Sequence, residues 1–288
     1  MTGPRPRPAG TPPVALSIAG SDSGAGAGLQ ADLKAMSALG VFATTVVTAV
    51  TAQNTRAVTA VHPVPAEVVA AQLDAVLDDF AVAATKTGML ARADVVDLVA
   101  DRAAQGALPN LVVDPVMVAS TGRRLLYDDA VEAYRRRLVA HALVVTPNLF
   151  EAAILAGVEP VADADVGTMG DLARRIHDLG PQWVLVKGGH LPGVHGSGGG
   201  PAPDRVADVL FDGVDLRVLE DTRVATRNNH GTGCSLASAT AALLARGADV
   251  PGAVAGAKRF VHDALVGSAG WTLGSGHGPL DPFGWSSR

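Results

Sequence analysis

The stretch NNHGTGCS, residues 228–235, leads directly into LASATAALL, residues 236–244. The second run is rich in Ala and Leu and has neither Gly nor Pro, so we expect a helix there. Gly231 and Gly233 leave little side-chain bulk before this helix, whose N–H groups and dipole favour an anion at that end. Cys234, the single cysteine of the chain, lies on the first turn, where a thiol ionises more easily than a free one with a pKa of about 8.5. An anion hole beside an activatable side chain suits group transfer to a hydroxyl.

A simpler interpretation of the same residues stays open at this point. Gly-x-Gly before a helix can be only a tight turn, and a single Cys is commonly a small buried hydrophobe. We interpret His230, in the middle of the stretch, as structural rather than catalytic. The rest of the chain decides between the two interpretations.

Outward from this stretch, short apolar runs alternate with helical patterns. Strands are expected at about residues 14–19, 43–50, 81–86, 111–113, 142–145 and 183–186, followed by a hairpin of strands 206–211 and 214–219. Helices are expected at about 29–39, after Pro65, and at 91–104, 128–139, 148–156, 164–179, 233–246 and 250–268. This alternation predicts an α/β fold, with a mainly parallel central sheet and helices on both faces.

The composition fits one large domain. Residues 1–13 are rich in Pro and Gly and are predicted to be a disordered tail, and residues 14–288 contain no linker and are predicted to be a single domain. Hydrophobic residues make up 48% of the 288 residues, enough for a substantial core. Residues 192–205 are rich in Gly and Pro and are predicted to be a mobile surface loop.

Several function classes are disfavoured by the totals. The net charge of −5 gives no indication of nucleic-acid binding. One cysteine excludes an internal disulfide, and the eight histidines show no zinc-ligand spacing. No apolar run reaches the roughly 18–20 residues of a membrane span, so we expect no membrane association and a cytoplasmic protein.

Polar residues gather where the predicted strands end. Because ligands of open α/β sheets bind beyond the carboxyl ends of the strands, this placement predicts a binding site at one edge of the sheet. The residues concerned are Asp22, Gln53, Lys86, Asp114, Asn148 and Lys187.

Each candidate side chain has a structural alternative. Gln53 is either an ordinary turn residue or an amide that reads a ring nitrogen and an amino group together. Met89 is either a core residue or the wall of a pocket for an aromatic ligand. Asp32 lies in the first turn of its predicted helix, where it compensates the dipole or, given its nearness to the glycine-rich loop 20–28, faces a substrate.

The remaining candidates concern phosphate and metal. Asp114 and Glu151 are either a strand-end acid and a first-turn helix acid, or ligands of Mg²⁺ through water, because this ion takes few carboxylates and keeps its waters. Lys187 follows an apolar strand and precedes two glycines, which favours a phosphate contact. The loop 20–28 carries Gly24-x-Gly26-x-Gly28 rather than the dinucleotide fingerprint, and no Walker A motif occurs. Any use of ATP therefore belongs to a family without a P-loop.

Eight stretches taken together resemble one family. They read AGSDSGAGAGLQADLK (19–34), TAVTAQNT (48–55), KTGML (86–90), DPVMVA (114–119), TPNLFEA (146–152), VKGGH (186–190), HGTGC (230–234) and GHGP (276–279). In this order and spacing they resemble the hydroxymethylpyrimidine/phosphomethylpyrimidine kinases of thiamine biosynthesis, over about residues 14–285.

The resemblance implies a ribokinase-like three-layer αβα fold, with ATP as co-substrate and Mg²⁺ as metal. It implies phosphorylation of 4-amino-5-hydroxymethyl-2-methylpyrimidine and then of its monophosphate to the diphosphate. By motif, the pyrimidine pocket takes Gly20, Asp32, Gln53, Met89, Val116 and Cys234. Gly231, Thr232 and Gly233 form the anion hole, and Lys187, Asn148, Glu151 and Asp114 serve the phosphates and the metal. A homodimer is expected by analogy with other kinases of this fold.

The sequence departs from the family pattern at three places, one of which is the stretch 192–205, which looks longer than usual. Asn228-Asn229 stands where Asn-Thr is usual, and Ser120-Thr121-Gly122 stands where a lysine is frequent, which puts a phosphate contact from that loop in doubt. At the anion hole Cys234 separates a pyrimidine kinase from most sugar kinases of the fold, which place an aspartate there.

The expected mechanism is in-line transfer of the γ-phosphoryl group, with the anion hole and Lys187 stabilising the transferred charge and Cys234 accepting the hydroxyl proton as a thiolate. Loops near 118–124 and 192–205 are expected to close over the site. Two alternatives remain: a pyridoxal kinase of the same fold, and a non-catalytic pyrimidine-binding sensor. A NAD-binding enzyme is disfavoured because the second strand lacks a terminal acid for the ribose.

Overall fold

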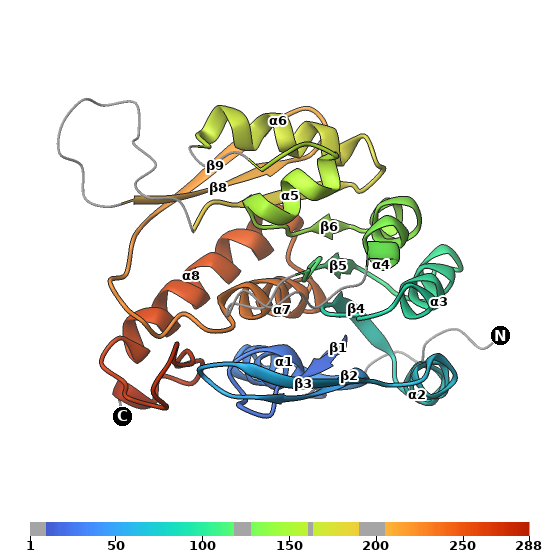
Figure 1. The fold of residues 1–288 in the computed structure, drawn as a ribbon, viewed down its shortest axis with the longest axis horizontal. Helices are drawn as coiled ribbons and strands as arrows, with labels where there is room; N and C mark the ends of the chain where they lie inside the picture. The colour runs from blue at the N-terminus through green and yellow to red at the C-terminus, as the bar shows by residue number, and fades with distance from the viewer. Residues whose placement is uncertain (1–9, 118–127, 161–163, 190–204, 288) are drawn as a thin grey trace.

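A computed structural model describes residues 10–117, 128–160, 164–189 and 205–287 of the chain. Within these ranges the strands form one nine-stranded sheet in the order β3-β2-β1-β4-β5-β6-β7-β8-β9 (Figure 1). Six neighbouring strands, from β2 to β7, run parallel, and β3, β8 and β9 join by antiparallel pairing. The strands are β1 Val14–Ser21, β2 Phe42–Gln53, β3 Val58–Pro63, β4 Val82–Thr87, β5 Leu111–Val113, β6 Val144–Val145, β7 Trp183–Lys187, β8 Arg205–Phe211 and β9 Leu216–Thr222.

Helices cover both faces of the sheet (Figure 1). The helices are α1 Gly28–Ala38, α2 Ala66–Asp79, α3 Ala93–Ala104, α4 Asp128–Ala133, α5 Leu149–Ala156, α6 Val166–His177, α7 Thr232–Ala245 and α8 Val250–Ser268. Short helical segments are a π-helix at Tyr134–Leu138 and 3₁₀ turns at Val139–His141 and Trp285–Ser287. None of the helices in the described ranges is long and apolar enough to cross a membrane.

The period of two along a strand divides the core into two layers. In β5, Leu111 and Val113 enter a cluster with residues of α2, α3, α5 and α6. Val112 points the other way, into a cluster with α1, α7 and α8. Because successive side chains of a strand face opposite sides, an entirely apolar strand indicates burial on both faces. The predicted α/β fold with a mostly parallel sheet is thereby confirmed.

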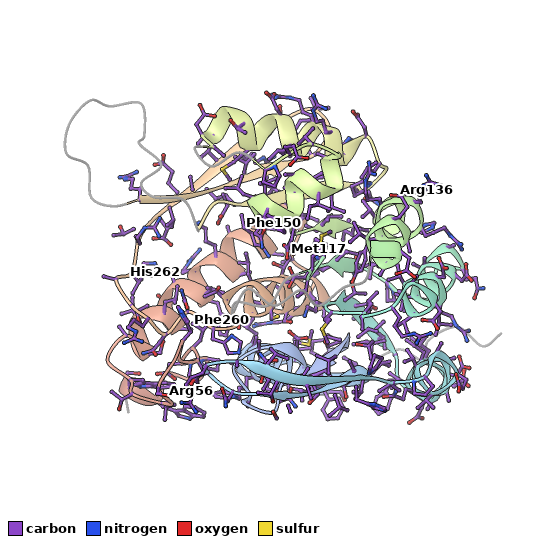
Figure 2. The ribbon with its side chains drawn as sticks, in the orientation of Figure 1. Arg56, Met117, Arg136, Phe150, Phe260 and His262 are labelled. Atoms are coloured by element: carbon purple, nitrogen blue, oxygen red, sulfur yellow. The ribbon has the colours of Figure 1, made fainter. Side chains whose placement is uncertain are left out.

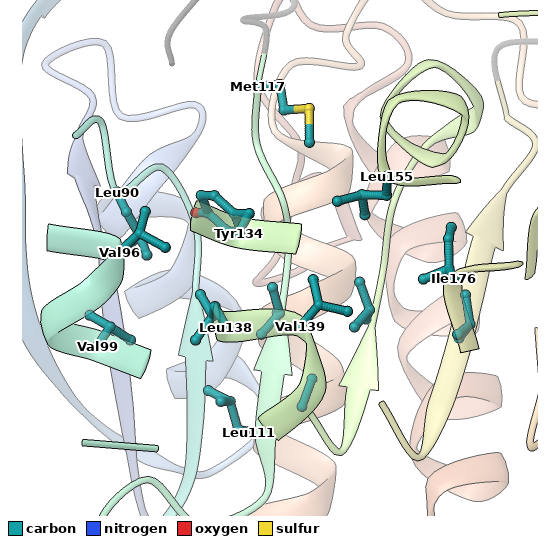
Figure 3. Packing of buried hydrophobic residues seen from close by; sticks show 14 of the residues in the cluster. Leu90, Val96, Val99, Leu111, Met117, Tyr134, Leu138, Val139, Leu155 and Ile176 are labelled. Atoms are coloured by element: carbon teal, nitrogen blue, oxygen red, sulfur yellow. The ribbon is translucent and has the colours of Figure 1, made fainter. Parts of the chain in front are cut away.

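Three local features differ from what the sequence predicted. Residues 128–139 do not form one helix: α4 gives way to the π-helix, whose Tyr134 and Leu138 are fully buried against α3 and β5 (Figure 3). The strand β3 was not predicted, since it is a half-exposed edge strand that ends at Pro63, a residue tolerated at sheet edges. Asp32 does not lie in the first turn of α1 but beyond it, on the buried side.

Other predictions fall outside the described residues. These are most of the tail 1–13, the loop near 118–124 and nearly all of 192–205. The parallel strands that are described all point their carboxyl ends to one edge. That edge carries Gln53 as the last residue of β2 and Lys187 as the last of β7, with Asp114 directly after β5.

Candidate active site

A cavity of about 1080 Å³ lies along this edge of the sheet. It is bounded by the strand ends, the glycine-rich loop and the start of α7, and its outer part lies between α5 and α8, the helices that carry Phe150 and His262 (Figure 2). The sequence-predicted site residues that line it are Gly20, Gln53, Met89, Asp114, Val116, Asn148, Glu151, Lys187, Gly231, Thr232, Gly233 and Cys234. Of the predicted set, Asp32 alone is not among the lining residues.

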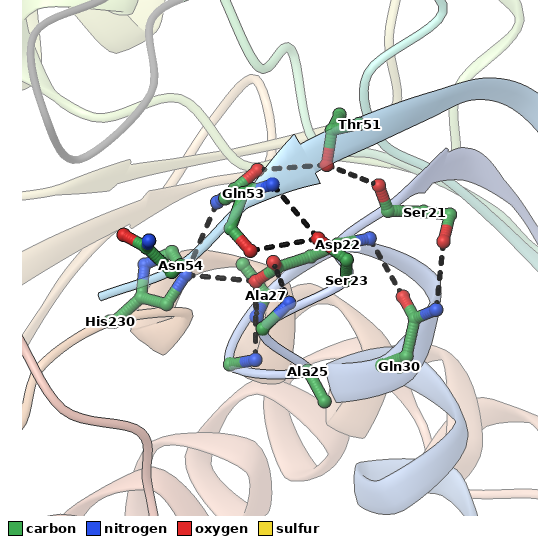
Figure 4. Close-up of polar contacts among 12 residues, drawn as sticks. Ser21, Asp22, Ser23, Ala25, Ala27, Gln30, Thr51, Gln53, Asn54 and His230 are labelled. Atoms are coloured by element: carbon green, nitrogen blue, oxygen red, sulfur yellow. Dashed lines mark hydrogen bonds and ion pairs between the residues drawn. The ribbon is translucent and has the colours of Figure 1, made fainter. Parts of the chain in front are cut away.

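The glycine-rich loop folds around the carboxylate of Asp22, which accepts hydrogen bonds from three backbone N–H groups of the loop at 2.8–3.1 Å. His230 Nε2 lies 2.9 Å from Asp22 Oδ2 and 3.3 Å from Gln53 Nε2 (Figure 4). Burial opposes ionisation of Asp22, but the bonds from His230 and the loop hold the pKa of its carboxyl below the ordinary value. His230 thus ties the segment before α7 to the loop and to β2, in agreement with a structural role.

The start of α7 depends on Gly231, which adopts a φ of +87°. A Cβ at this position would lie 1.9 Å from the carbonyl oxygen of Gly26, so no other residue fits. The first bond of the helix ladder runs from Ser235 N–H to the Gly231 carbonyl at 2.9 Å. In this geometry the N–H groups of Gly233 and Cys234 have no acceptor one turn back, as an anion site at a helix N-terminus requires.

A lysine faces that helix end. The ammonium of Lys187 lies 3.0 Å from Asp114 Oδ1, and a Cβ built on Gly233 would be 3.2 Å from the same nitrogen. Burial disfavours the charge, but the carboxylates of Asp114 and Glu151 outweigh burial and raise the pKa of Lys187. A permanently charged ammonium therefore stands beside the N-terminus of α7.

Glu151 and Asn148 form a capping box at the start of α5. Glu151 N–H donates to Asn148 Oδ1 and Asn148 N–H donates to Glu151 Oε2, both at 2.9 Å. The Glu151 carboxyl is buried, which together with the nearby charge of Asp114 raises its pKa to about 7 against the opposing effect of Lys187. The first-turn placement of Glu151 is confirmed, and the acid faces the cavity.

The two carboxylates fit a hydrated divalent cation. Asp114 and Glu151 are both buried and close enough for one to raise the pKa of the other, a repulsion that a cation between them would relieve. No group of three or more His, Cys, Asp or Glu that could hold a metal occurs in the described ranges. A site with only two carboxylates suits Mg²⁺, which keeps several of its waters.

The predicted contact of Asp32 with a substrate is not supported. Its side chain is fully buried, and its two oxygens accept from Lys86 at 2.8 and 2.9 Å. Ser17 and Ser238 each donate to it at 2.6 Å. Lys86 on β4 has no exposure either, and Asp32 overcomes burial to raise the pKa of that ammonium. Asp32 therefore neutralises Lys86, a buried lysine of the cavity lining, without lining the cavity itself.

The expectation of an easily ionised Cys234 was wrong. Burial, together with the carboxylates of Asp114 and Asp32, raises the pKa of this thiol to about 11, against the lowering effect of Lys86 and of a backbone hydrogen bond from Gly28. The helix N-terminus does favour a thiolate, but desolvation and two carboxylates outweigh it here. Near pH 7 the side chain is a neutral thiol.

Residues on the outer wall of the cavity were missed. Asp208 on β8 and Lys258 on α8 form an ion pair there, each with little exposure, and His262 pairs with Asp221 at 3.3 Å. No motif marks these residues. A charged residue inside the apolar strand 205–211 was the available signal for Asp208, since a buried charge is paired or functional.

Comparison with known proteins adds a separate line of evidence. Residues 22–281 match the family model described as phosphomethylpyrimidine kinase. The hydroxymethylpyrimidine/phosphomethylpyrimidine kinase of Rhizobium meliloti is 48% identical over 270 residues, which cover 94% of this chain and 97% of that protein. The chloroplastic thiamine biosynthetic bifunctional enzyme of Arabidopsis thaliana is 46% identical, over 94% of this chain and 50% of that enzyme. The solved pyridoxal kinase of Staphylococcus aureus, in complex with AMP-PCP and pyridoxal, is 34% identical with a TM-score of 0.83 and covers 96% of this chain and 95% of that one.

Proposed function

This chain belongs to the phosphomethylpyrimidine kinase family, and from that premise we propose how its residues phosphorylate their substrate. The activity is the ATP-dependent phosphorylation of hydroxymethylpyrimidine, and then of its monophosphate, in thiamine biosynthesis. One observation supports this assignment of residues. The ammonium of Lys187 lies next to the first turn of α7, in the cavity at the carboxyl ends of the strands.

Phosphoryl transfer is assigned to the start of α7. In-line transfer leaves charge on the equatorial oxygens of the moving group, so positioning and electrostatic stabilisation dominate catalysis. The N–H groups of Gly233 and Cys234 and the ammonium of Lys187 supply that stabilisation from two sides. Gly231 and Thr232 shape the turn that aims these N–H groups.

The donor phosphates and the metal are assigned to the neighbouring strand ends. Mg²⁺, when bound, supplies positive charge to the donor phosphates. Asp114 and Glu151 would hold it through water, as the fit of the two carboxylates supports. Asn148 orients Glu151 through the capping box and lines the cavity beside it.

The pyrimidine is assigned to the part of the cavity that Gly20, Gln53, Met89 and Val116 line. Gly20 lets the side chain of Met89 pack against the backbone of the loop, because a Cβ at Gly20 would come within 2.4 Å of Met89 Cε. Met89 and Val116 provide apolar walls for a flat ring. Gln53 offers an amide that matches a ring nitrogen and an amino group together.

Cys234 is proposed to orient the acceptor hydroxyl rather than to act as a thiolate general base. Its neutral thiol lies beside the helix N–H groups, where it can hydrogen-bond to the acceptor hydroxyl and orient it. A loose transition state places little demand on a base, because the acceptor hydroxyl loses its proton late, to an oxygen of the transferred phosphoryl group. The raised pKa of the thiol supports this role.

Two further properties belong to the proposal. ATP-dependent turnover of a small metabolite is consistent with a cytoplasmic enzyme. Kinases of this fold are often dimers, so a homodimer is the oligomeric state to test. Sedimentation velocity over a tenfold range of concentration separates a dimer from a monomer.

One experiment tests the activity. The purified protein is incubated with ATP, Mg²⁺ and hydroxymethylpyrimidine, with pyridoxal in a parallel reaction, and products are followed by mass. We expect a monophosphate and then a diphosphate from the pyrimidine. Product from pyridoxal alone would move the assignment to vitamin B6 salvage, an alternative that the likeness to a pyridoxal kinase structure keeps in view. Tight pyrimidine binding without any product would leave a sensor.

A further inference from the structure

A carboxylate outside the anion hole holds the backbone that follows Lys187. Gly188 N–H donates to Asp208 Oδ1 at 2.9 Å, and the pairing of β7 with β8 places Lys187 opposite Asp208. The fit is close, because a Cβ on Gly188 would lie 2.1 Å from the carbonyl oxygen of Ala207. The residue next to Lys187 is therefore fixed by one side-chain acceptor on the neighbouring strand.

Asp208 is itself paired by Lys258 of α8. The Lys258 ammonium bonds to Asp208 Oδ2, and the two side chains are only 14% and 10% exposed. Both residues line the cavity. An unpaired buried carboxylate is costly, and phosphates entering the cavity would repel it. By neutralising the carboxylate, Lys258 stabilises Asp208 in the position in which it accepts the hydrogen bond from Gly188 N–H.

Attachment of α8 to the sheet does not by itself account for this pair. Buried ion pairs add little net stability over apolar residues of the same size, and α8 already packs through Val254, Ala257 and Val261 in the apolar cluster with α7. The pair adds a hydrogen-bond acceptor, the carboxylate of Asp208, at a fixed position beside the strand end that carries Lys187.

We infer that Asp208, held in place by Lys258, is a positioning residue for Lys187. The inference rests on the proposed role of Lys187 in phosphoryl transfer. A displacement of about 1 Å at a reacting group can cost about 100-fold in rate. Loss of the acceptor should accordingly lower kcat at saturating ATP while leaving KM for the pyrimidine nearly unchanged, because Asp208 bonds to Gly188 and Lys258 rather than to a residue assigned to the pyrimidine.

The test compares Asp208→Ala with Asp208→Asn, which keeps an oxygen acceptor for Gly188 N–H. We expect the alanine variant to lose about 10- to 100-fold in kcat and the asparagine variant to stay within about threefold of wild type. Asp281→Ala is the matched control, since Asp281 is a buried carboxylate beside α8 that also accepts backbone N–H groups but lies outside the cavity. It should lower the thermal midpoint without lowering kcat.

Lys187→Met in the same series separates the two ideas. If Lys187→Met keeps its activity, the proposed role of Lys187 fails. Two results would overturn the positioning inference. The first is an inactive Lys187→Met variant beside an Asp208→Ala variant with the kcat of wild type. The second is a loss of kcat in Asp208→Asn as large as that in Asp208→Ala. Should Asp208→Ala not fold, Lys258→Met replaces it. A fall in kcat in Lys258→Met, together with a near-normal kcat in Lys258→Arg, supports the inference. An unchanged kcat in Lys258→Met refutes it.

Discussion

The protonation state of Cys234 gives the sharpest prediction about mechanism. With a pKa of about 11, only about one thiol in 3,000 is ionised at pH 7.5. A mechanism that needed the thiolate would therefore gain about tenfold in kcat per pH unit between about pH 7 and 10. We expect no such rise, because the neutral thiol orients the acceptor hydroxyl.

The assay is a pH series of kcat for wild type and Cys234→Ala under saturating substrates. The alanine variant keeps its backbone N–H and should lose less than about tenfold in kcat, against the roughly 10²–10⁴ expected for removal of a general base. Titration of the thiolate by ultraviolet absorbance, with Cys234→Ala as the blank, measures the pKa itself. A steep alkaline rise in kcat that disappears in Cys234→Ala would show a thiolate base and refute the reasoning.

Three further predictions follow from the site. Asp32→Ala leaves the ammonium of Lys86 buried and unpaired, so it should lower the free energy of unfolding by about 3–5 kcal/mol in urea titrations; a loss below about 1 kcal/mol would contradict the pairing. Glu151, with a pKa of about 7, becomes neutral as pH falls, so Mg²⁺-dependent activity should decline below about pH 7 and recover with more Mg²⁺; Glu151→Gln should abolish this pH dependence, and a flat wild-type profile would exclude it. Gly231→Ala puts a Cβ against the carbonyl oxygen of Gly26 and should lose soluble expression or most of its kcat; a normal kcat would mean that the turn tolerates a side chain.

The sequence predicted what depends on short-range patterns. β5 at Leu111–Val113 and α8 at Val250–Ser268 coincide with the predicted ranges. The strand-end residues meet at one edge because parallel strands share a direction, a rule that needs no knowledge of side-chain contacts. Glu151 in the first turn of α5 follows from local capping in the same way.

Long-range electrostatics set the limits of that prediction. Asp32 was expected to face a ligand because its neighbours in sequence do, but its partner Lys86 is 54 residues away on β4. Cys234 was expected to ionise easily from its place on a helix, while the acids that oppose its ionisation are Asp114, directly after β5, and Asp32 on α1. Residue type and spacing do not show which charged groups lie close together in the buried interior. For Asp32 and Cys234 those neighbouring charges determine how the side chain behaves.

The two lysines of the site are held in different ways, which separates their functions. Lys86 is fully buried, and its partner Asp32 is fixed by two serine hydroxyls at 2.6 Å, so an incoming phosphate has no means to displace that carboxylate. Lys187 is partly exposed to the cavity, and its partner Asp114 is one of the two acids that fit Mg²⁺. If Asp114 and Glu151 held Mg²⁺, the ammonium of Lys187 would share Asp114 with that ion and would be available to a phosphate oxygen. Lys187 rather than Lys86 is therefore the cation that we propose responds to the donor. Asp208, which accepts the hydrogen bond from Gly188 N–H, fixes the strand end at which a small displacement would affect Lys187 most.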